Sequence, residues 1–256
     1  MEYKKEYKCS VLSREMLLGD TAYIELNCPD IARTARPGQF VNVSCSRFLK
    51  RPFGIASVDR DSGSFFIGVK SIGSGTGEII TLDRGDEVDV LGPLGNGFDL
   101  DSFGSYILVS GGTGVFPVNF AAQYLESSGK NFTVVQGFGD ASQVVLNRPS
   151  YVLTTDSGDC GIKGTAIAGL DTLDKCVCGS SSCIICVGPV PMMKAVSGWA
   201  LNHSMKCYVS MEQRMACGVG ICLCCIVKVK ADNKDGFVNV RCCKDGPVFD
   251  SSEVIW

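Results

Sequence analysis

The sequence predicts a multi-domain chain: an antiparallel β-barrel, an α/β domain with a doubly wound parallel sheet, and a small cysteine-rich C-terminal domain. Three observations lead to this prediction. Short alternating runs with frequent turns extend to about residue 101, strands then alternate with helices to about residue 210, and cysteines are dense after that. We therefore expect domains at residues 1–101, 102–210 and 211–256.

The first part contains short runs in which apolar and polar residues alternate. They are separated by turn residues such as Pro37-Gly38 and Gly95-Asn96-Gly97. Period-two runs of this length with frequent turns are typical of an antiparallel barrel or sandwich. The runs are residues 21–26, 39–45, 64–70 and 86–92.

The middle part begins with a continuous apolar run, residues 106–110, which is typical of a buried strand. A glycine turn and an expected helix at 118–129 follow. Strands that alternate with helices predict a parallel, doubly wound sheet. The other expected elements are strands at 132–138, 151–155 and 183–188 and a helix at 191–204.

Composition and charge exclude several classes of protein. With 45% hydrophobic and 20% charged residues in 256, the chain has the composition of a globular protein. Its net charge of −3 argues against a nucleic-acid binder, because such proteins carry a basic surplus. The longest uncharged stretch, residues 102–125, is interrupted by glycines and Pro117, so we expect no membrane helix. The first ten residues lead into no apolar core of the signal-peptide kind, so we expect a cytoplasmic protein.

The number of cysteines is the first chemical clue. The chain has 15 of them and no export signal, and cytosolic thiols stay reduced. A dense group of cysteines in such a protein typically binds metal or serves redox chemistry. We therefore do not expect a disulfide framework.

The C-terminal part carries the most specific motif. Three cysteines have the spacing C-x4-C-x2-C and a fourth follows a hairpin-like stretch, as in plant-type [2Fe–2S] sites. Gly218 and Gly220 lie inside the first interval, where they allow a tight loop to wrap a cluster. A zinc site is the alternative, although zinc sites usually pair C-x2-C units. The four expected ligands are Cys217, Cys222, Cys225 and Cys243.

The same spacing occurs a second time, at Cys178, Cys183 and Cys186. Here the apolar residues around Ile184 indicate a buried strand, whose side chains alternate between opposite faces. Because free cysteine is a common core residue, we interpret this second group as packing. The only histidine, His203, is expected to be a surface or packing residue.

The glycine turn after the first middle strand is a candidate nucleotide site. A glycine turn between strand and helix lets a pyrophosphate approach the helix N-terminus. Pro117 replaces the third glycine of the dinucleotide fingerprint, so a purely structural turn is equally compatible. After the next strand, residues 137–143 contain no Arg or Lys, and Asp140 suits a free ribose hydroxyl, which favours NAD over NADP. The candidate turn residues are Gly111, Gly112, Thr113 and Gly114.

Two segments of the first part are candidates for holding an anionic cofactor with a flat ring. Arg51 is suited to clamp a pyrophosphate, and Phe53 to lie against a ring. Gly75 and Thr76 would offer backbone amides and a hydroxyl. Ordinary barrel turns explain each segment equally well.

Taken together, these motifs resemble the electron-transfer subunits of dihydroorotate dehydrogenase B, in the ferredoxin–NADP reductase superfamily. The quoted segments are RPF at 51–53, GGTGVFP at 111–117, GPVPMMKAV at 188–196 and MEQRMACGVGICLCC with CKDGPVF in the tail. The resemblance implies an FAD-binding barrel, an NAD-binding domain and a [2Fe–2S] domain. It implies that FAD is held by Arg51, Pro52, Phe53, Gly54, Gly68, Val69, Lys70, Gly75 and Thr76.

The resemblance also selects the fourth cluster ligand and exposes two departures. Cys243 is preferred over Cys242 because the family's last ligand directly precedes x-Asp-Gly-Pro, which leaves Cys242 and Cys224 as extra thiols. The family usually has Ser or Thr where this chain has Gly54, so that flavin contact is absent, made by backbone or supplied elsewhere. The superfamily often has Cys at the position of Val187, so we assign Cys186 no role in hydride transfer.

The implied function is an electron relay without a catalytic acid or base in this chain. An FMN-bearing partner subunit would oxidise dihydroorotate, and electrons would pass through the cluster and FAD to NAD+ in pyrimidine biosynthesis. The family implies a heterotetramer with two of each subunit. One alternative is a subunit of an NADH-dependent ferredoxin or sulfide oxidoreductase. Another is a zinc-stabilised binding module without redox activity.

Overall fold

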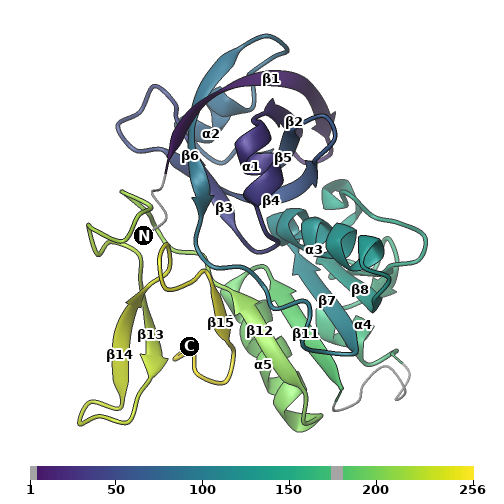
Figure 1. Cartoon of the computed structure of the whole chain (residues 1–256). Helices are drawn as coiled ribbons and strands as arrows, with labels where there is room; N and C mark the ends of the chain where they lie inside the picture. Colours follow the sequence, from purple (N-terminus) through teal and green to yellow (C-terminus); the bar gives the residue numbers. More distant parts are fainter. Residues whose placement is uncertain (1–4, 174–180) are drawn as a thin grey trace.

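In the part of the chain that the structure describes, residues 5–173 and 181–256, the N-terminal region closes into a six-stranded antiparallel barrel (Figure 1). The structure is a computed structural model. Neighbouring strands follow the order β1-β2-β5-β4-β3-β6, and their inward side chains fill the barrel with an apolar core. The strands are β1 (Glu6–Leu17), β2 (Thr21–Asn27), β3 (Phe40–Val43), β4 (Arg51–Asp59), β5 (Ser64–Lys70) and β6 (Glu87–Leu94).

Two short helices pack on the barrel core. Helix α1 (Pro29–Thr34) starts with proline at its first position, where no N–H is needed, and buries Ile31 in the core. Helix α2 (Ser74–Ile79) contributes Ile79 to the same core. The chain passes from the end of β5 into α2 after three residues, and α2 contacts β5, which places the turn before α2 at the barrel rim.

The second part is a sheet with strand order β10-β9-β8-β7-β11-β12-β15, which counts seven strands within the described residues. All neighbours are parallel except β12 and β15, which are antiparallel. The strands are β7 (Ser105–Gly111), β8 (Asn131–Phe138), β9 (Val152–Thr155), β10 (Ile162–Lys163), β11 (Ser182–Val187), β12 (Lys206–Ser210) and β15 (Val248–Asp250).

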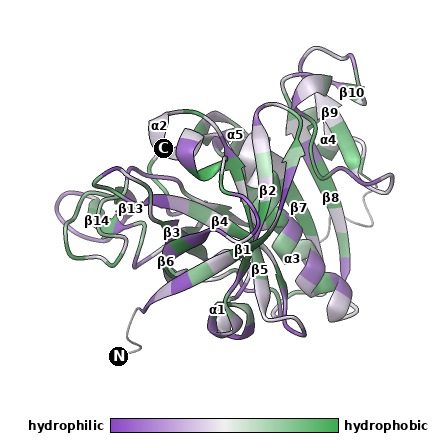
Figure 2. Ribbon diagram, turned by 90° about the horizontal axis from the view of Figure 1, so that it is seen from above, coloured by the Kyte–Doolittle hydropathy of each residue, from purple (hydrophilic) through white to green (hydrophobic). Residues whose placement is uncertain are grey.

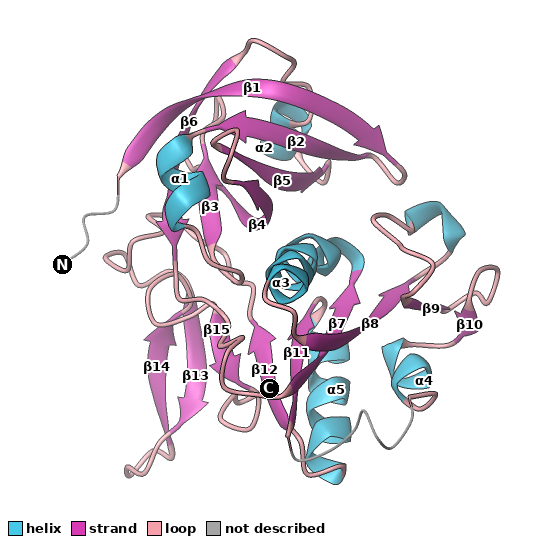
Figure 3. Ribbon diagram, turned by 45° about the vertical axis from the view of Figure 1, so that its right-hand side comes forward, coloured by secondary structure: helices cyan, strands magenta, loops and turns pink. Residues whose placement is uncertain are grey.

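Helices cover both faces of this sheet (Figure 3). On one face, helix α3 (Val115–Ser127) packs its apolar side against Leu108 and Ile185. On the other, α4 (Ala166–Leu170) and α5 (Val190–Asn202) pack against Val109 and Ile184. Short 3-10 helices, η1 (Gly112–Gly114) and η2 (Ala141–Gln143), follow β7 and β8. The sheet therefore has the doubly wound arrangement that the alternating elements predict.

The third part leaves the sheet and returns to it. After β12 the chain forms a cysteine loop, residues 217–225, and a hairpin of β13 (Ile226–Lys230) and β14 (Phe237–Arg241). It then comes back as β15, beside β12, where Ser210 pairs with Val248. Figure 1 shows the hairpin projecting beside the sheet, in yellow-green. The C-terminal segment is thus bound at both ends to the α/β sheet.

Polar contacts hold the barrel, the sheet domain and the C-terminal segment together. On α3, Asn119 donates to the Ala56 carbonyl at 3.0 Å, and Gln123 exchanges two hydrogen bonds with the backbone of Val58. In the connection from barrel to sheet, the Asn96 side chain bonds the backbone of Val248 in both directions at 2.9 Å.

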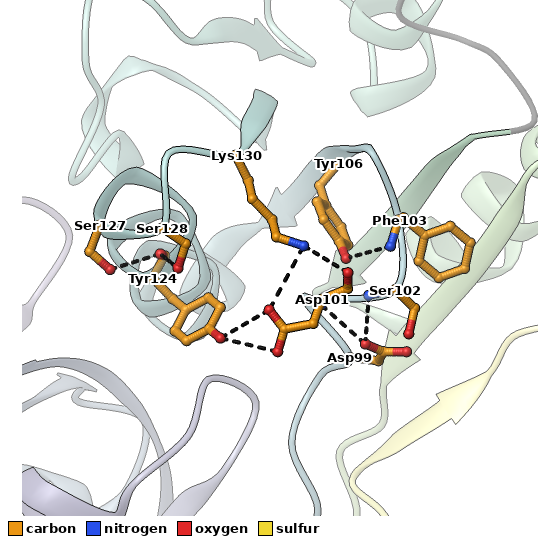
Figure 4. A network of polar contacts seen from close by, with 9 residues as sticks. All are labelled: Asp99, Asp101, Ser102, Phe103, Tyr106, Tyr124, Ser127, Ser128 and Lys130. Atoms are coloured by element: carbon orange, nitrogen blue, oxygen red, sulfur yellow. Dashed lines mark hydrogen bonds and ion pairs between the residues drawn. The ribbon is translucent and has the colours of Figure 1, made fainter.

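The rest of that connection is tied to α3 (Figure 4). Asp101 accepts from the Tyr124 hydroxyl at 3.1 Å, and its carbonyl accepts from the Lys130 ammonium at 2.7 Å. The Tyr106 hydroxyl accepts from the Phe103 N–H at 3.1 Å. These bonds fix the chain where it passes from the barrel into the first strand of the sheet.

The sequence-based prediction of a barrel, a doubly wound sheet and a cysteine-rich segment is confirmed, and the barrel alternative replaces the sandwich. The sequence missed β1, because polar and apolar residues are mixed along its whole length (Figure 2). It also missed β4 and the two barrel helices. Among the described residues, no helix combines the length and the apolar character needed to cross a bilayer.

Candidate functional site

A cavity of about 400 Å³ lies where the barrel, the sheet domain and the C-terminal segment meet. Strands β4 and β5 provide one wall, and the start of α3 provides another. The segment after β12, from Ser210 to Met215, closes the third side. Met215 is two residues from Cys217, so the cavity and the cysteine loop are neighbours along the chain.

The RPFG segment at the start of β4 lines this cavity, as the sequence predicts for residues that would hold a flavin. The Arg51 guanidinium donates to the Leu49 carbonyl at 2.6 Å and lies over Gly75. A Cβ at Gly75 would come within 2.5 Å of Arg51 Nε, so only glycine leaves this cation in place. The predicted pair Arg51 and Gly75 therefore forms one built feature.

Thr76 and Val69 lie differently from what their predicted roles suggest. The Thr76 hydroxyl lines the cavity, but it already accepts from the N–H groups of Ile72 and Gly73 at 3.0 and 3.1 Å. The Val69 side chain is fully buried in the barrel core, so only its backbone remains for a ligand. Lys70 is directed to the cavity on the opposite face of β5.

Two of the three glycines that line the cavity, Gly54 and Gly68, are places where the barrel closely approaches α3. A Cβ at Gly68 would lie 2.2 Å from the Phe116 ring, which shows how tightly the barrel packs on α3. A Cβ at Gly54 would lie 3.2 Å from Pro117. The hydroxyl groups that line this cavity belong to Thr76, Thr113 and Ser210. Ser210 was missed by the sequence analysis because its position depends on the register of β12 against β11.

The glycine turn connects β7 to α3 and contacts the carboxyl end of the adjacent parallel strand β11. A Cβ at Gly114 would lie 2.1 Å from the Val187 carbonyl oxygen, so the end of β11 contacts the turn directly. Gly112 has φ +53, in the left-handed region that favours glycine. The N-terminus of α3 has no side-chain cap and lies at this edge, where open α/β sheets bind nucleotides. Thr113 also lines the cavity, so the glycine turn and the RPFG segment border the same space.

Asp140 lies at the same edge, directly after β8. Hydrogen bonds from Ser142 and Gln143 hold the pKa of its carboxyl below the usual value, even though burial acts in the opposite direction. A second carboxylate, Asp159, accepts from the Ala141 N–H at 3.2 Å, and it interacts with Asp140. The sequence analysis missed Asp159, since only folding brings it beside Asp140. Two neighbouring carboxylates disfavour a 2′-phosphate at this position.

The cysteine loop wraps around the sulfur of Cys217. This sulfur accepts from the N–H groups of Val219, Ile221 and Cys222 at 3.4–3.5 Å. Burial opposes ionisation, but these N–H donors outweigh it and lower the pKa of the Cys217 thiol to about 6. Gly218 and Gly220, with φ +69 and +84, provide the left-handed turns that bring the N–H groups inward.

The four predicted ligands form two pairs. In the first pair, a hydrogen bond joins the side chains of Cys217 and Cys222. In the second, the Cys225 sulfur accepts from the Cys243 N–H at 3.4 Å, and a further hydrogen bond joins the two thiols. Cys243 interacts electrostatically with Cys217, which places the pairs next to each other. Over the described residues, no group of three or more His, Cys, Asp or Glu side chains surrounds a single metal position. Two neighbouring pairs of cysteines fit the four-cysteine ligand set of a two-iron cluster.

The extra thiols, Cys242 and Cys224, belong to neither pair. The Cys242 sulfur donates to the Met211 carbonyl at 3.0 Å and is fully buried. Cys224 is exposed on the loop. This geometry favours Cys243 over Cys242 as a cluster ligand.

The second group of cysteines and the single histidine have structural surroundings, as predicted. Cys183 and Cys186 lie in β11, fully buried on opposite faces of the sheet. Cys178 lies outside the described residues. His203 ends α5, where its ring stacks on Trp199 with centroids 3.7 Å apart.

Comparisons with known proteins agree with this arrangement. Residues 212–255 match the family described as the iron–sulfur cluster binding domain of dihydroorotate dehydrogenase B. The dihydroorotate dehydrogenase B (NAD+) electron transfer subunit of Desulforamulus reducens is 36% identical, over 98% of this chain and 99% of the relative. The protein of the same name from Clostridium perfringens is 37% identical, over 85% of this chain and 86% of the relative.

Two solved structures extend the comparison. A chain of the NADH-dependent reduced ferredoxin–NADP oxidoreductase has a TM-score of 0.84 and 27% identity, covering 97% of this chain and 90% of that chain. Phthalate dioxygenase reductase has a TM-score of 0.63 and 20% identity, covering 92% of this chain and 76% of that chain. The second likeness concerns the fold alone.

Proposed function

This chain belongs to the family of dihydroorotate dehydrogenase B electron transfer subunits, and from that membership we propose that it relays electrons from a dihydroorotate-oxidising partner to NAD+ in pyrimidine biosynthesis. The observation that carries the proposal is the junction of the cavity with the cysteine loop. The segment from Ser210 to Met215 lines the cavity, and Cys217 follows two residues later. Two redox sites therefore share one stretch of backbone.

The cavity fits a flavin in size and charge. Its volume of about 400 Å³ is within the range of small-molecule sites, and Arg51 and Lys70 place positive charge on its wall. Arg51 is held over Gly75, ready to pair with a pyrophosphate in the planar geometry that guanidinium favours. Phe40 and Phe53 supply apolar walls that orient a flat ring and exclude water. When bound, FAD exchanges hydride and single electrons, and a [2Fe–2S] cluster exchanges single electrons.

The cysteine loop fits a cluster because its sulfurs and N–H groups are already arranged for one. Cys217 is held by three N–H donors that favour its thiolate, which is the ligand form. Cys225 and Cys243 are buried, so they would hold their side of the cluster away from water. Cys222 is exposed and would form the outer corner.

The carboxyl edge of the sheet fits NAD(H). Gly111 to Gly114 bring backbone N–H groups to the position where a pyrophosphate would bind, and Gly188 keeps the facing turn close to Gly111. Asp140 would accept from a ribose hydroxyl, and together with Asp159 it would repel a 2′-phosphate. No acid or base from this chain is required for hydride transfer.

An electron transfer subunit implies a catalytic partner subunit. We propose that this partner carries FMN and that two copies of each subunit assemble in the cytoplasm. The exposed apolar side chains of Ile221 and Leu223, which flank Cys222, support the cysteine loop as the side that meets the partner. Such a contact would shield the cluster and shorten the path of the electron.

A second function is favoured by one observation. The structural likeness to the NADH-dependent reduced ferredoxin–NADP oxidoreductase extends over nearly the whole of both chains. The same fold and the same cofactors would then serve exchange with ferredoxin instead of dihydroorotate. The partner decides between the two functions.

The proposal is tested with the full chain purified without oxygen, alone and with a dihydroorotate dehydrogenase catalytic subunit. We expect about two irons, two sulfides and one FAD per chain, with visible absorbance that NADH bleaches faster than NADPH. With the partner, dihydroorotate should bleach the same absorbance. Bleaching by reduced ferredoxin but not by dihydroorotate would select the second function. A colourless protein containing zinc would overturn both.

The preference for NADH has its own variant. Asp140→Ala should weaken binding of NADH, measured from the rate of bleaching against NADH concentration. The matched control is Asp101→Ala, which removes a carboxylate from the link to α3, away from this edge. Equal NADH binding by the Asp140 variant and the wild type would remove Asp140 from the nucleotide site.

A further inference from the structure

Strand β3 has one face that touches both redox sites. Phe40 points outward from the barrel and lines the cavity. Asn42, on the same face, reaches the cysteine loop: a Cβ on Gly218 would lie 2.1 Å from Asn42 Nδ2. Val41, between them, points into the barrel core. The register of β3 against β6 shifts between Phe40 and Asn42, a β-bulge of the kind that redirects side chains.

The Asn42 amide is buried, with its carbonyl oxygen unpaired within the described part of the chain. The residue is 1% exposed, and among the described residues its Oδ1 atom has no hydrogen-bond partner. Burying an unpaired amide costs more than burying an apolar side chain of the same shape. Leu94 packs on the same side of Gly218, so the surroundings are suited to leucine. The end of the amide that faces Gly218 is its N–H donor, Nδ2.

The neighbour of this amide is the first ligand segment of the cluster. Gly218 directly follows Cys217, whose sulfur already receives three backbone N–H groups. The positive φ of Gly218 and its contact with Asn42 both exclude a side chain at this position. Asn42 is therefore a polar point at which the barrel contacts the loop.

We propose that Asn42 is a positioning residue that holds the Cys217 side of the cluster and raises its reduction potential. The proposal rests on the proposed function, because it concerns the cluster. N–H donors near cluster sulfurs, with the positive end of the dipole toward the cluster, stabilise the additional negative charge of the reduced form. The amide on β3 thereby tunes the cluster from the same strand whose Phe40 borders the flavin cavity.

The test is an EPR-monitored redox titration of the full chain, loaded with FAD and cluster, in wild type, Asn42→Leu and Asn42→Asp. Leucine has a similar shape and lacks the amide dipole, so the ratio of reduced to oxidised cluster should fall about tenfold at the wild-type midpoint, equal to ~59 mV for one electron. Asn42→Asp, which adds negative charge, should lower the ratio further. The control Asn119→Leu removes an amide at the contact of α3 with the barrel and should leave the potential unchanged.

Full iron content with an unchanged potential in both Asn42 variants would overturn the proposal and leave the proposed function intact. A wild-type chain that assembles no cluster would instead contradict the proposed function. If Asn42→Leu does not fold, Asn42→Ser is titrated, since serine removes the amide and leaves its space unfilled. Its potential should also fall, and a wild-type value would count against the proposal.

The contact itself has a steric test. Gly218→Ala should release iron faster than wild type, because its methyl group meets Asn42 and its φ is positive. The double variant Gly218→Ala with Asn42→Ala removes the collision and should recover part of the iron retention. No recovery would mean that Asn42 does not press on the loop.

Discussion

Two stretches of this chain share the spacing C-x4-C-x2-C, and their surroundings give them opposite chemistry. In the cysteine loop, glycines with positive φ aim backbone N–H groups at Cys217 and lower its pKa to about 6. In β11, burial raises the pKa of Cys183 and Cys186 and keeps them as neutral thiols. The spacing C-x4-C-x2-C alone therefore does not determine the chemistry of the cysteines. The nearby N–H groups, and not the spacing, separate the pKa of Cys217 from those of Cys183 and Cys186.

The largest expected effect is the loss of the cluster on substitution of a loop cysteine. Cys243→Ser should reduce the iron content from about two per chain to near zero, because the buried partner of Cys225 is removed. The matched controls are Cys242→Ser, next in the sequence, and Cys183→Ala, in the strand group. Iron and sulfide assays measure the outcome. A colourless Cys183→Ala variant, or a Cys242→Ser variant without iron, would break the comparison.

A smaller effect concerns the reactivity of the thiols in protein freed of iron. Cys217 has a lowered pKa of about 6, so it is mostly thiolate at pH 7 and loses its reactivity as the pH falls through 6. Cys186 has a raised pKa and stays protonated at both pH values. Labelling with iodoacetamide, followed by mass spectrometry of the peptides, should therefore be fast and pH-dependent for Cys217 and slow for Cys186. Equal rates would contradict the assignment of the two environments.

The smallest effect is on stability. Cys186→Ser should lower the free energy of unfolding by about 1–3 kcal/mol, because it buries a hydroxyl within an apolar core. Cys224→Ser changes an exposed thiol and should remain within about 0.5 kcal/mol of wild type. Urea unfolding followed by circular dichroism measures both. A Cys186 variant as stable as the Cys224 variant would argue that the strand group is not a packing group.

The fold was predictable where local pattern determines structure. Alternating runs identified the barrel, and the continuous apolar run at 106–110 identified the central strand of the sheet. Strand β1 was not predictable, because its pairing with β2 and β6 is a property of the ladder and not of its mixed sequence. The return of β15 to the sheet also depends on a contact across 38 residues of sequence, from Ser210 to Val248.

The candidate site was predictable where a motif is contiguous. Spacing predicted Cys217, Cys222 and Cys225 as ligands, and the family resemblance added Cys243. The RPFG segment was a candidate from its residue types and the resemblance, and the structure places it at the cavity. Asn42, Asp159 and Ser210 were not, since each becomes relevant only when folding brings it to a segment distant in sequence. Val69 shows the reverse case: it lies within a matching motif, yet its side chain is committed to the barrel core.

Because β12 pairs with β15, the cysteine-rich segment leaves the sheet and returns to it at neighbouring positions. Its two ends, Ser210 and Val248, are register partners, and the Met211 N–H bonds the Pro247 carbonyl at 2.8 Å just beyond them. A segment whose ends already meet resembles a cassette inserted into a hairpin. The flavin and nucleotide parts could therefore exist before, or without, the iron-binding segment. An ancestral reductase could gain this segment, and with it electron transfer to a new partner, while its sheet stays the same.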